Sequence, residues 1–156
     1  HVDAEAHVIH GGKRLGDYPL MAFSGLARVA DLRGLSVVDA SALDSIESCD
    51  WLLLCTGQSE KWGSEEYFGT EPLFTEAFVK AAARIACKGI GLDCSGLDRE
   101  GVALHRLWFS SGGGLMVENL TDLEMLLSES RILFAAYPLK LAAGDGAPVR
   151  AVAMLV

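Results

Sequence analysis

The residues best suited to chemistry stand at the start of the chain, where His1, Asp3 and His7 lie close together. Imidazole and carboxylate side chains are ligands that zinc and manganese take in proteins. In an extended backbone His1 and Asp3 point to the same side, and His7 lies one short loop further on. Two more ligand-type side chains, His105 and Glu118, occur beside apolar segments far downstream. The pattern predicts a metal or acid–base site assembled from three distant segments.

The spacing of the first three residues is a weak motif by itself. On spacing alone, a tag remnant or a solvated tail is the preferred interpretation of the histidine-rich terminus, and a lone His105 is more often an ordinary histidine on a helix face. Glu118 is more informative, because a carboxylate buried among apolar residues is costly unless it is paired or binds a cation. The pairing of His105 with Glu118 therefore favours a site over these alternatives.

The elements that must position these residues follow an α/β pattern in one domain, residues 1–156, because short apolar runs alternate with helical patterns. The final strands have no helices between them, which predicts a mixed sheet. Polar groups follow several strands, and ligand sites of open α/β sheets gather at the carboxyl ends of strands. The expected strands are 35–39, 51–55, 89–93, 115–118, 131–137 and 149–156, the expected helices are 75–87 (stopped by Gly89), 98–110 and 120–127 (capped by Asn119 or Thr121), and 57–69 and 144–146 are expected to be a loop and a turn.

The composition argues against two kinds of partner. The formal net charge of −8 comes without a basic stripe, so nucleic acid is not expected. No apolar stretch reaches the length of about 20 residues that crosses a membrane. The cysteines follow neither a zinc-ribbon nor a CxxC spacing, so they are expected to be free, buried thiols in a reducing cytoplasm. They are Cys49, Cys55, Cys87 and Cys94.

Several segments form an ordered series that covers essentially the whole chain. They are HVDAEAH at 1–7, CTGQSEKWG at 55–63, GIGLDCSGLD at 89–98, His105-Arg106 with VENL at 117–120, and DGAPVRAVA at 145–153. The series resembles the cyclase family of metal-dependent hydrolases, which includes bacterial-type kynurenine formamidase and isatin hydrolase. The resemblance implies a compact fold of the swivelling β/β/α type, assembled into homodimers or higher homo-oligomers.

The resemblance also implies a role for each candidate residue. His1, Asp3, His105 and Glu118 fall on the positions of divalent zinc or manganese ligands, with Asp3 bridging where two metals bind. His7 falls on the catalytic acid–base position. The implied reaction is hydrolysis of a small amide or cyclic amide, of the arylformamide or lactam type, by metal-activated water. In that reaction His7 passes a proton to the departing nitrogen.

Three further residues are candidates for substrate contact. Trp62 is expected to shape the loop and the wall of an aromatic pocket. Ser95 suggests a Ser-His-Asp site, but no GxSxG elbow surrounds it, which favours a turn or pocket hydroxyl. Asn119 either supports Glu118 or caps the next helix. Arg150 is expected to be a structural ion-pair partner.

Two departures from the family pattern leave other hypotheses open. The first histidine and the Gly-Thr pair of the family's HxGTHxDxPxH segment would precede His1, so an N-terminal segment is expected to be missing, which would leave sheet edges open to a partner. Glu5 stands where the family usually has proline, a change that would loosen the loop. The second hypothesis is therefore a truncated or degenerate member that binds metal or a small ligand without catalysing. A serine hydrolase through Ser95 is the third.

Overall fold

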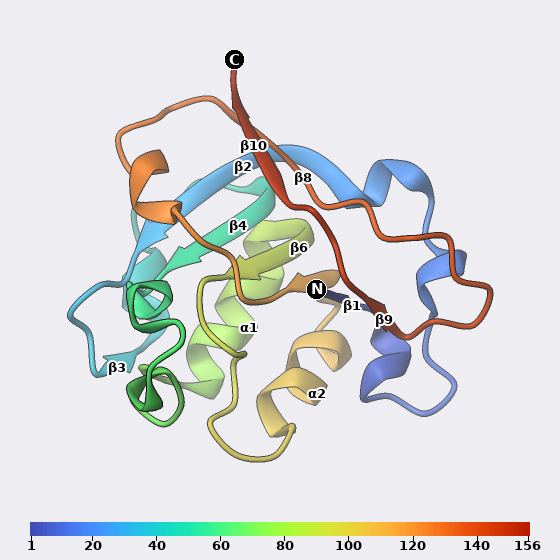
Figure 1. Cartoon of the computed structure of the whole chain (residues 1–156), viewed down its shortest axis with the longest axis horizontal. Coiled ribbons are helices and arrows are strands. Elements are labelled where there is room, and N and C mark those ends of the chain that lie inside the picture. Colours follow the sequence, from blue (N-terminus) through green and yellow to red (C-terminus); the bar gives the residue numbers. More distant parts are fainter.

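A curled mixed sheet organises the chain, and the computed structural model describes all of its residues, 1–156 (Figure 1). The strands are β1 (Val2–Asp3), β2 (Ser24–Asp31), β3 (Val37–Val38), β4 (Cys49–Cys55), β5 (Leu73–Phe74), β6 (Ala86–Leu92), β7 (Leu115–Val117), β8 (Ile132–Ala135), β9 (Gly146–Ala147) and β10 (Val152–Leu155). The α-helices are α1 (Glu76–Ile85) and α2 (Ala103–Ser110), and short 3-10 helices occupy Glu5–His7, Leu15–Asp17, Leu20–Phe23, Ala40–Leu43, Gln58–Lys61, Glu65–Tyr67 and Leu123–Leu126.

The centre of the sheet is parallel and both of its sides are antiparallel. The order of the eight-stranded sheet is β10-β8-β2-β4-β6-β7-β1-β9. Strands β2, β4, β6 and β7 run parallel to one another, whereas β8, β10, β1 and β9 pair in the antiparallel sense. A separate small sheet joins β3 and β5 in parallel. Since β1 pairs with β7, the start of the chain lies beside the carboxyl end of a central strand.

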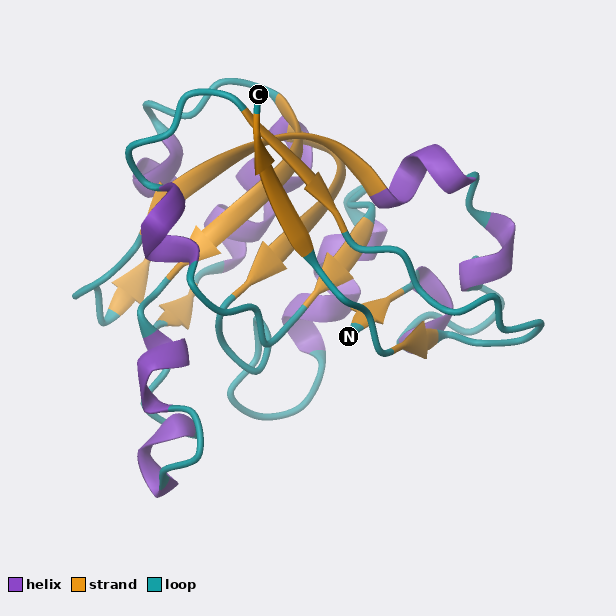
Figure 2. Ribbon diagram, turned by 45° about the horizontal axis from the view of Figure 1, so that its top comes forward, coloured by secondary structure: helices purple, strands orange, loops and turns teal.

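Two apolar cores lie on opposite faces of this sheet. Because side chains alternate along a strand, Leu52 and Leu54 of β4 enter one core, while Trp51 and Leu53 enter the other. Helices α1 and α2 cover the first core, and Figure 2 shows both on the same side of the sheet. The second core contains β8 and the 3-10 helix at Leu123–Leu126. Neither α-helix has the length and apolar character that crossing a membrane would require.

The predicted class, an α/β domain with a mixed sheet, is confirmed. Strands β4, β6 and β7 lie where apolar runs predicted strands, and α1 begins directly after its cap, Thr75, whose hydroxyl accepts the Phe78 N–H at 3.1 Å. The helix ends earlier than predicted, at Ile85, because Ala86 already pairs with Cys49 of β4. Gly89 is therefore inside a strand and does not stop the helix.

Strand β2, which is central to the sheet, is absent from the expected strands. Its burial alternates only as far as Ala27, and there the large Leu26 is exposed while the smaller Ala27 is buried. Arg28 interrupts the apolar pattern, and its guanidinium pairs with Glu47 at 2.9 Å and donates to the Ser130 carbonyl at 2.6 Å. A partly polar strand of this kind is specified by its neighbours rather than by its own pattern.

Two predicted helices are shorter than expected. The segment 98–110 is helical only from Ala103, because the Asp98 carboxylate accepts the Leu104 and His105 N–H groups at 2.8 and 3.0 Å. The segment 120–127 is a 3-10 helix over Leu123–Leu126 that follows Asp122 in the left-handed region, φ 61°. Neither Asn119 nor Thr121 caps it, so that prediction is wrong.

Smaller corrections concern loops and thiols. The predicted loop 57–69 contains two 3-10 helices, the strand at 35–39 is reduced to Val37–Val38 with Val37 exposed, and the turn at 144–146 leads into β9. The strands at 131–137 and 149–156 are shortened to β8 and β10. All cysteines are free, as predicted, and Cys55 and Cys94 are buried, but Cys49 is only partly buried and Cys87 is exposed.

Candidate metal centre

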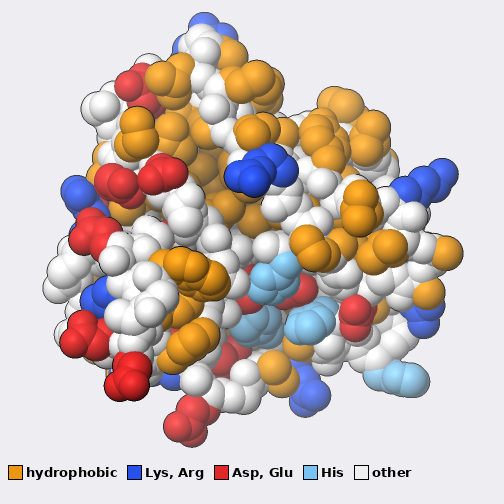
Figure 3. All heavy atoms as spheres, viewed as in Figure 1, with side chains coloured by type: hydrophobic (Ala, Val, Ile, Leu, Met, Phe, Trp, Pro, Cys, Tyr) orange, Lys and Arg blue, Asp and Glu red, His pale blue; other side chains and the backbone are white.

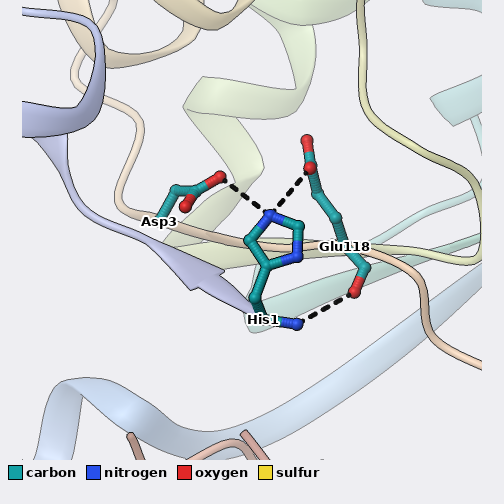
Figure 4. Close-up of side chains that lie close together, drawn as sticks. All are labelled: His1, Asp3 and Glu118. Atoms are coloured by element: carbon teal, nitrogen blue, oxygen red, sulfur yellow. Dashed lines mark hydrogen bonds and ion pairs between the residues drawn. The ribbon is translucent and has the colours of Figure 1, made fainter. Parts of the chain in front are cut away.

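The pairing of β1 with β7 brings the two ends of the predicted site together. Val2 lies opposite Val117, and the Glu118 N–H donates to the His1 carbonyl at 3.0 Å. Figure 4 shows the result: the His1 ring lies between the carboxylates of Asp3 and Glu118. His1 Nε2 is 3.4 Å from Asp3 Oδ2 and 3.1 Å from Glu118 Oε2.

The carboxylates of this group are buried, whereas His1 reaches the surface. Asp3 is 2% exposed and Glu118 is 5% exposed. Hydrogen bonds to Asp3 and Glu118 raise the pKa of His1 to about 10. Burial acts to raise the pKa of Glu118, but hydrogen bonds from His1 and His105 outweigh it, so this pKa lies below its ordinary value. Glu118 and Asp3 are thus buried acids that meet at a point open to solvent through His1.

His105 approaches the other oxygen of Glu118. Its Nε2 lies 2.8 Å from Glu118 Oε1, and its Nδ1 lies 2.7 Å from Asp98 Oδ2. Burial acts to lower the pKa of His105, but the two carboxylates overcome that effect and raise it to about 9. An imidazole held by a carboxylate on one nitrogen, with the other nitrogen directed into a site, is typical of histidine metal ligands.

Asp98 contacts the His105 ring from behind and was not among the predicted site residues. The same carboxylate caps α2 and orients His105, so it fixes both the helix start and the ring. The signal was available in principle, because an aspartate shortly before a helical pattern is a common cap. The helix was predicted to begin at Asp98 itself, so Asp98 was treated as a helical residue and not as a cap.

His7 lies beside this group without touching it. Its Nδ1 is 4.0 Å from Asp3 Oδ1 and 3.8 Å from Asp145 Oδ2, and its side chain is 42% exposed. Glu5 holds the intervening loop, since its carboxylate accepts the Lys13 N–H at 3.1 Å. Figure 3 shows the outcome on the surface, where pale-blue histidine side chains gather around red carboxylates.

The three candidates for substrate contact are dispersed. Asn119 lines a cavity of about 500 Å³ that also includes His1 and Glu118, and its Oδ1 accepts the Tyr67 hydroxyl at 2.5 Å. Trp62 is 65% exposed and packs edge-on against Tyr67 outside that cavity. Ser95 donates to Glu71 Oε1 at 2.9 Å and has no imidazole partner, so a Ser-His-Asp arrangement at Ser95 is not formed.

The donor set is suitable for a divalent cation. One ligand atom from each of His1, Asp3 and Glu118 lies within 4.8 Å of the others, and His105 adjoins this group through Glu118. Nitrogen and carboxylate oxygen are the ligands of zinc and manganese sites. In this structure the imidazoles of His1 and His105 contact these carboxylates in the positions where a cation would be bound.

Fold and site together define an α/β protein with a histidine–carboxylate centre at the carboxyl end of its sheet. Residues 1–99 match the family model Cyclase, described as "Putative cyclase". The chain belongs to this cyclase family.

Known proteins resemble the chain over nearly its whole length. A kynurenine formamidase of Bacillus cereus is 28% identical over 157 residues, which cover 97% of this chain and 73% of the relative. A solved structure described as a potential metal-dependent hydrolase with cyclase activity superposes with a TM-score of 0.78 at 27% identity, over 96% of this chain and 74% of that one. Isatin hydrolase A from Labrenzia aggregata shares the fold, with a TM-score of 0.79 at 21% identity over 99% of this chain and 71% of that one.

Proposed function

We propose that the chain is a metal-dependent hydrolase that cleaves a small amide or cyclic amide of the arylformamide or lactam type. The observation that carries this proposal is the grouping of His1, Asp3 and Glu118, with His105 directed at the remaining oxygen of Glu118. The named relative is a formamidase, and the solved structure at 27% identity is described as a potential metal-dependent hydrolase, which supports the same chemistry.

Zinc or manganese is the cation that we propose for this centre, with His1, Asp3, His105 and Glu118 as the residues that would hold it. When bound, the metal would supply Lewis acidity, which polarises an amide carbonyl and makes water a better nucleophile at neutral pH. Asp98 keeps His105 aimed at Glu118, and the burial of Asp3 and Glu118 keeps both carboxylates in place.

His7 is the acid–base group that we assign to the reaction. Hydrolysis forms a C–O bond between water and the acyl carbon, breaks the C–N bond, and leaves one proton of the water on the departing nitrogen. Imidazoles transfer protons readily near neutral pH. His7 stands at the solvent side of Asp3, with Nδ1 4.0 Å from Oδ1, so it could reach a substrate held at the centre.

The experiment that tests the proposal combines metal analysis with turnover. The purified chain, dialysed without added metal, is expected to retain zinc or manganese and to hydrolyse formanilide when fully loaded. Asp3→Asn is expected to lose both the metal and the turnover, because it removes a buried anionic ligand. Metal binding and turnover that survive this substitution would refute the assigned site.

A second candidate is a family member that binds metal without catalysing. His7 favours it, because this side chain is partly exposed and lies no closer than 3.8 Å to a carboxylate. The distinguishing result is a protein that holds stoichiometric metal but turns over neither formanilide nor a lactam. Robust turnover that falls in His7→Gln, with metal content unchanged, would exclude this candidate.

We also propose that the chain forms homodimers or higher homo-oligomers in the cytoplasm. Strand β10 is an edge of the sheet and exposes Val152, Met154 and Leu155, and apolar edge strands favour pairing with another chain. The absence of disulfides among the cysteines supports a reducing location. Light scattering that gives the mass of a monomer would contradict the oligomer.

A further inference from the structure

The cavity beside the candidate metal centre is lined by many apolar residues together with the titratable residues His1, Glu118, Asp122 and Arg150. Its volume is about 500 Å³, and it opens between the segment that follows β7 and the strand β10. Leu120, Leu123 and Phe134 are among its apolar lining residues. Figure 3 shows this face as a hollow lined by orange side chains, next to the pale-blue histidines. His1 and Glu118 also line the cavity, so a ligand in the cavity would touch the candidate metal centre.

Arg150 is the only lysine or arginine that lines this cavity. It was expected to form a structural ion pair, but it forms none, and its guanidinium donates no hydrogen bond within the chain. Of the two acids in the lining, Glu118 is occupied by His1 and His105, and Asp122 accepts from Thr121 at 3.3 Å without pairing with Arg150. Arg150 is an exposed residue, so the cavity is lined by one cation that has no ion-pair partner in the chain.

The backbone around the cavity is held in a defined shape. Val149 forms a bridge with Pro138, and β10 begins at Val152, so Arg150 lies between two anchored points. Asn119 and Asp122 on the opposite wall have φ values of 58° and 61°. Asn and Asp adopt this left-handed conformation more readily than other non-glycine residues, so both positions are compatible with a tight turn here.

We propose that Arg150 binds a carboxylate of the substrate, so that the chain selects anionic amides with an apolar or aromatic body; this inference rests on the proposed amide hydrolysis. The guanidinium presents a planar pair of N–H donors that matches a carboxylate. The body of the substrate packs against the apolar lining, and its amide reaches the group at His1 and Glu118. Since the chain carries a net charge of −8, an anionic substrate is repelled over most of the surface and needs this local cation.

The test uses matched substrates that differ only in charge. These are the 2-, 3- and 4-formamidobenzoates and the corresponding neutral formamidobenzamides, hydrolysed by the metal-loaded chain. Wild type is expected to prefer one of the benzoates over its benzamide in kcat/KM. In Arg150→Gln this preference falls about 10- to 100-fold, mainly through KM, because a charge-assisted bidentate contact is lost. Arg150→Lys is expected to recover part of it.

Arg84→Gln is the control, because it removes the same charge from an exposed position on α1 that lines no part of the cavity. Its preference for the benzoate should match that of wild type. An unchanged preference in Arg150→Gln, or an equal loss in Arg84→Gln, would overturn the inference. If the neutral benzamides are turned over while the Arg150 inference fails, the proposed amide hydrolysis still stands.

A binding measurement covers the case in which no substrate is turned over. The aminobenzoate products are titrated into the same proteins by calorimetry, with the aminobenzamides as neutral references. Wild type and Arg150→Gln contain the same candidate ligands for the metal, so direct coordination of the carboxylate contributes equally to both. Binding that weakens about 10-fold or more in Arg150→Gln alone supports the anion site. Equal binding by both proteins refutes it.

Discussion

Two buried acids follow neighbouring parallel strands, and they differ in what their oxygens contact. Asp93 follows β6, and its carboxylate accepts the N–H and hydroxyl of Thr56 and the N–H of Gly57. Glu118 follows β7, and its two oxygens face His1 and His105. Both acids are at most 5% exposed, so burial does not distinguish them.

The hydrogen-bond partners of each acid determine the direction of its pKa shift and whether it lies beside other potential metal ligands. Burial raises the pKa of Asp93, and the donors from Thr56 and Gly57 offset only part of that effect. Burial acts in the same direction on Glu118, but the two imidazoles reverse it and lower the pKa. Asp93 holds a loop through backbone donors that have no other partner. Glu118 is held by side chains that are themselves potential metal ligands, so its neighbours can join it around a cation.

The largest expected difference between substitutions of Glu118 and Asp93 is in metal binding. Glu118→Gln should weaken binding of zinc or manganese at least about 100-fold, because it removes a buried anionic ligand that two imidazoles share. Metal titration with a competing chelator measures this. Asp93→Asn is the matched control, since its folded form should bind metal as wild type does; a similar loss in both variants would show that the two acids are not distinct.

The next largest effect is on the free energy of unfolding. Asp93→Ala should destabilise the chain by about 2–4 kcal/mol, because buried N–H groups of Thr56 and Gly57 lose their acceptor. Urea denaturation of metal-free protein gives this value. The exposed strand-end acid Asp39 is the reference, and Asp39→Ala should shift the midpoint far less. Equal shifts would mean that Asp93 is not a structural anchor.

A smaller effect is expected at Asp98, whose carboxylate both caps α2 and orients His105. Asp98→Asn should weaken metal binding about 10- to 100-fold, the usual range for a residue that orients a ligand histidine. The cap of α2 is also weakened, so the melting temperature is recorded in parallel. Metal affinity that is unchanged while stability falls would show that Asp98 acts only as a cap.

The smallest expected effect is on thiol reactivity, because burial raises the pKa of a thiol. Burial raises the pKa of Cys55 to about 11 and that of Cys94 to about 12. At pH 8 both should resist alkylation in the folded chain, whereas the exposed Cys87 should react. Mass spectrometry of peptides after limited labelling locates the modified thiols. Labelling of Cys94 as fast as that of Cys87 would contradict the described core.

The sequence predicted the strands of the apolar core better than it predicted the elements that carry polar contacts. Strong apolar runs such as 51–55 predicted their strands, because burial on both faces of the sheet leaves a continuous pattern. Strand β2 was missed because Arg28 is accommodated only through Glu47 and Ser130, both distant in sequence. Helix α2 was placed too early because the Asp98 cap acts across a loop, where local helix propensity carries no information.

The sequence by itself determined the α/β class and the residue types that could ligate a metal, because periodicity and donor chemistry are local properties. Only the tertiary structure decided which residues meet. Pairing of β1 with β7 joins His1 to Glu118, the α2 cap aims His105, and Trp62 and Ser95 are left outside the cavity that Asn119 lines. Arg150 acquires its position in the same way. Distances between remote segments depend on strand register and packing, which no local pattern encodes.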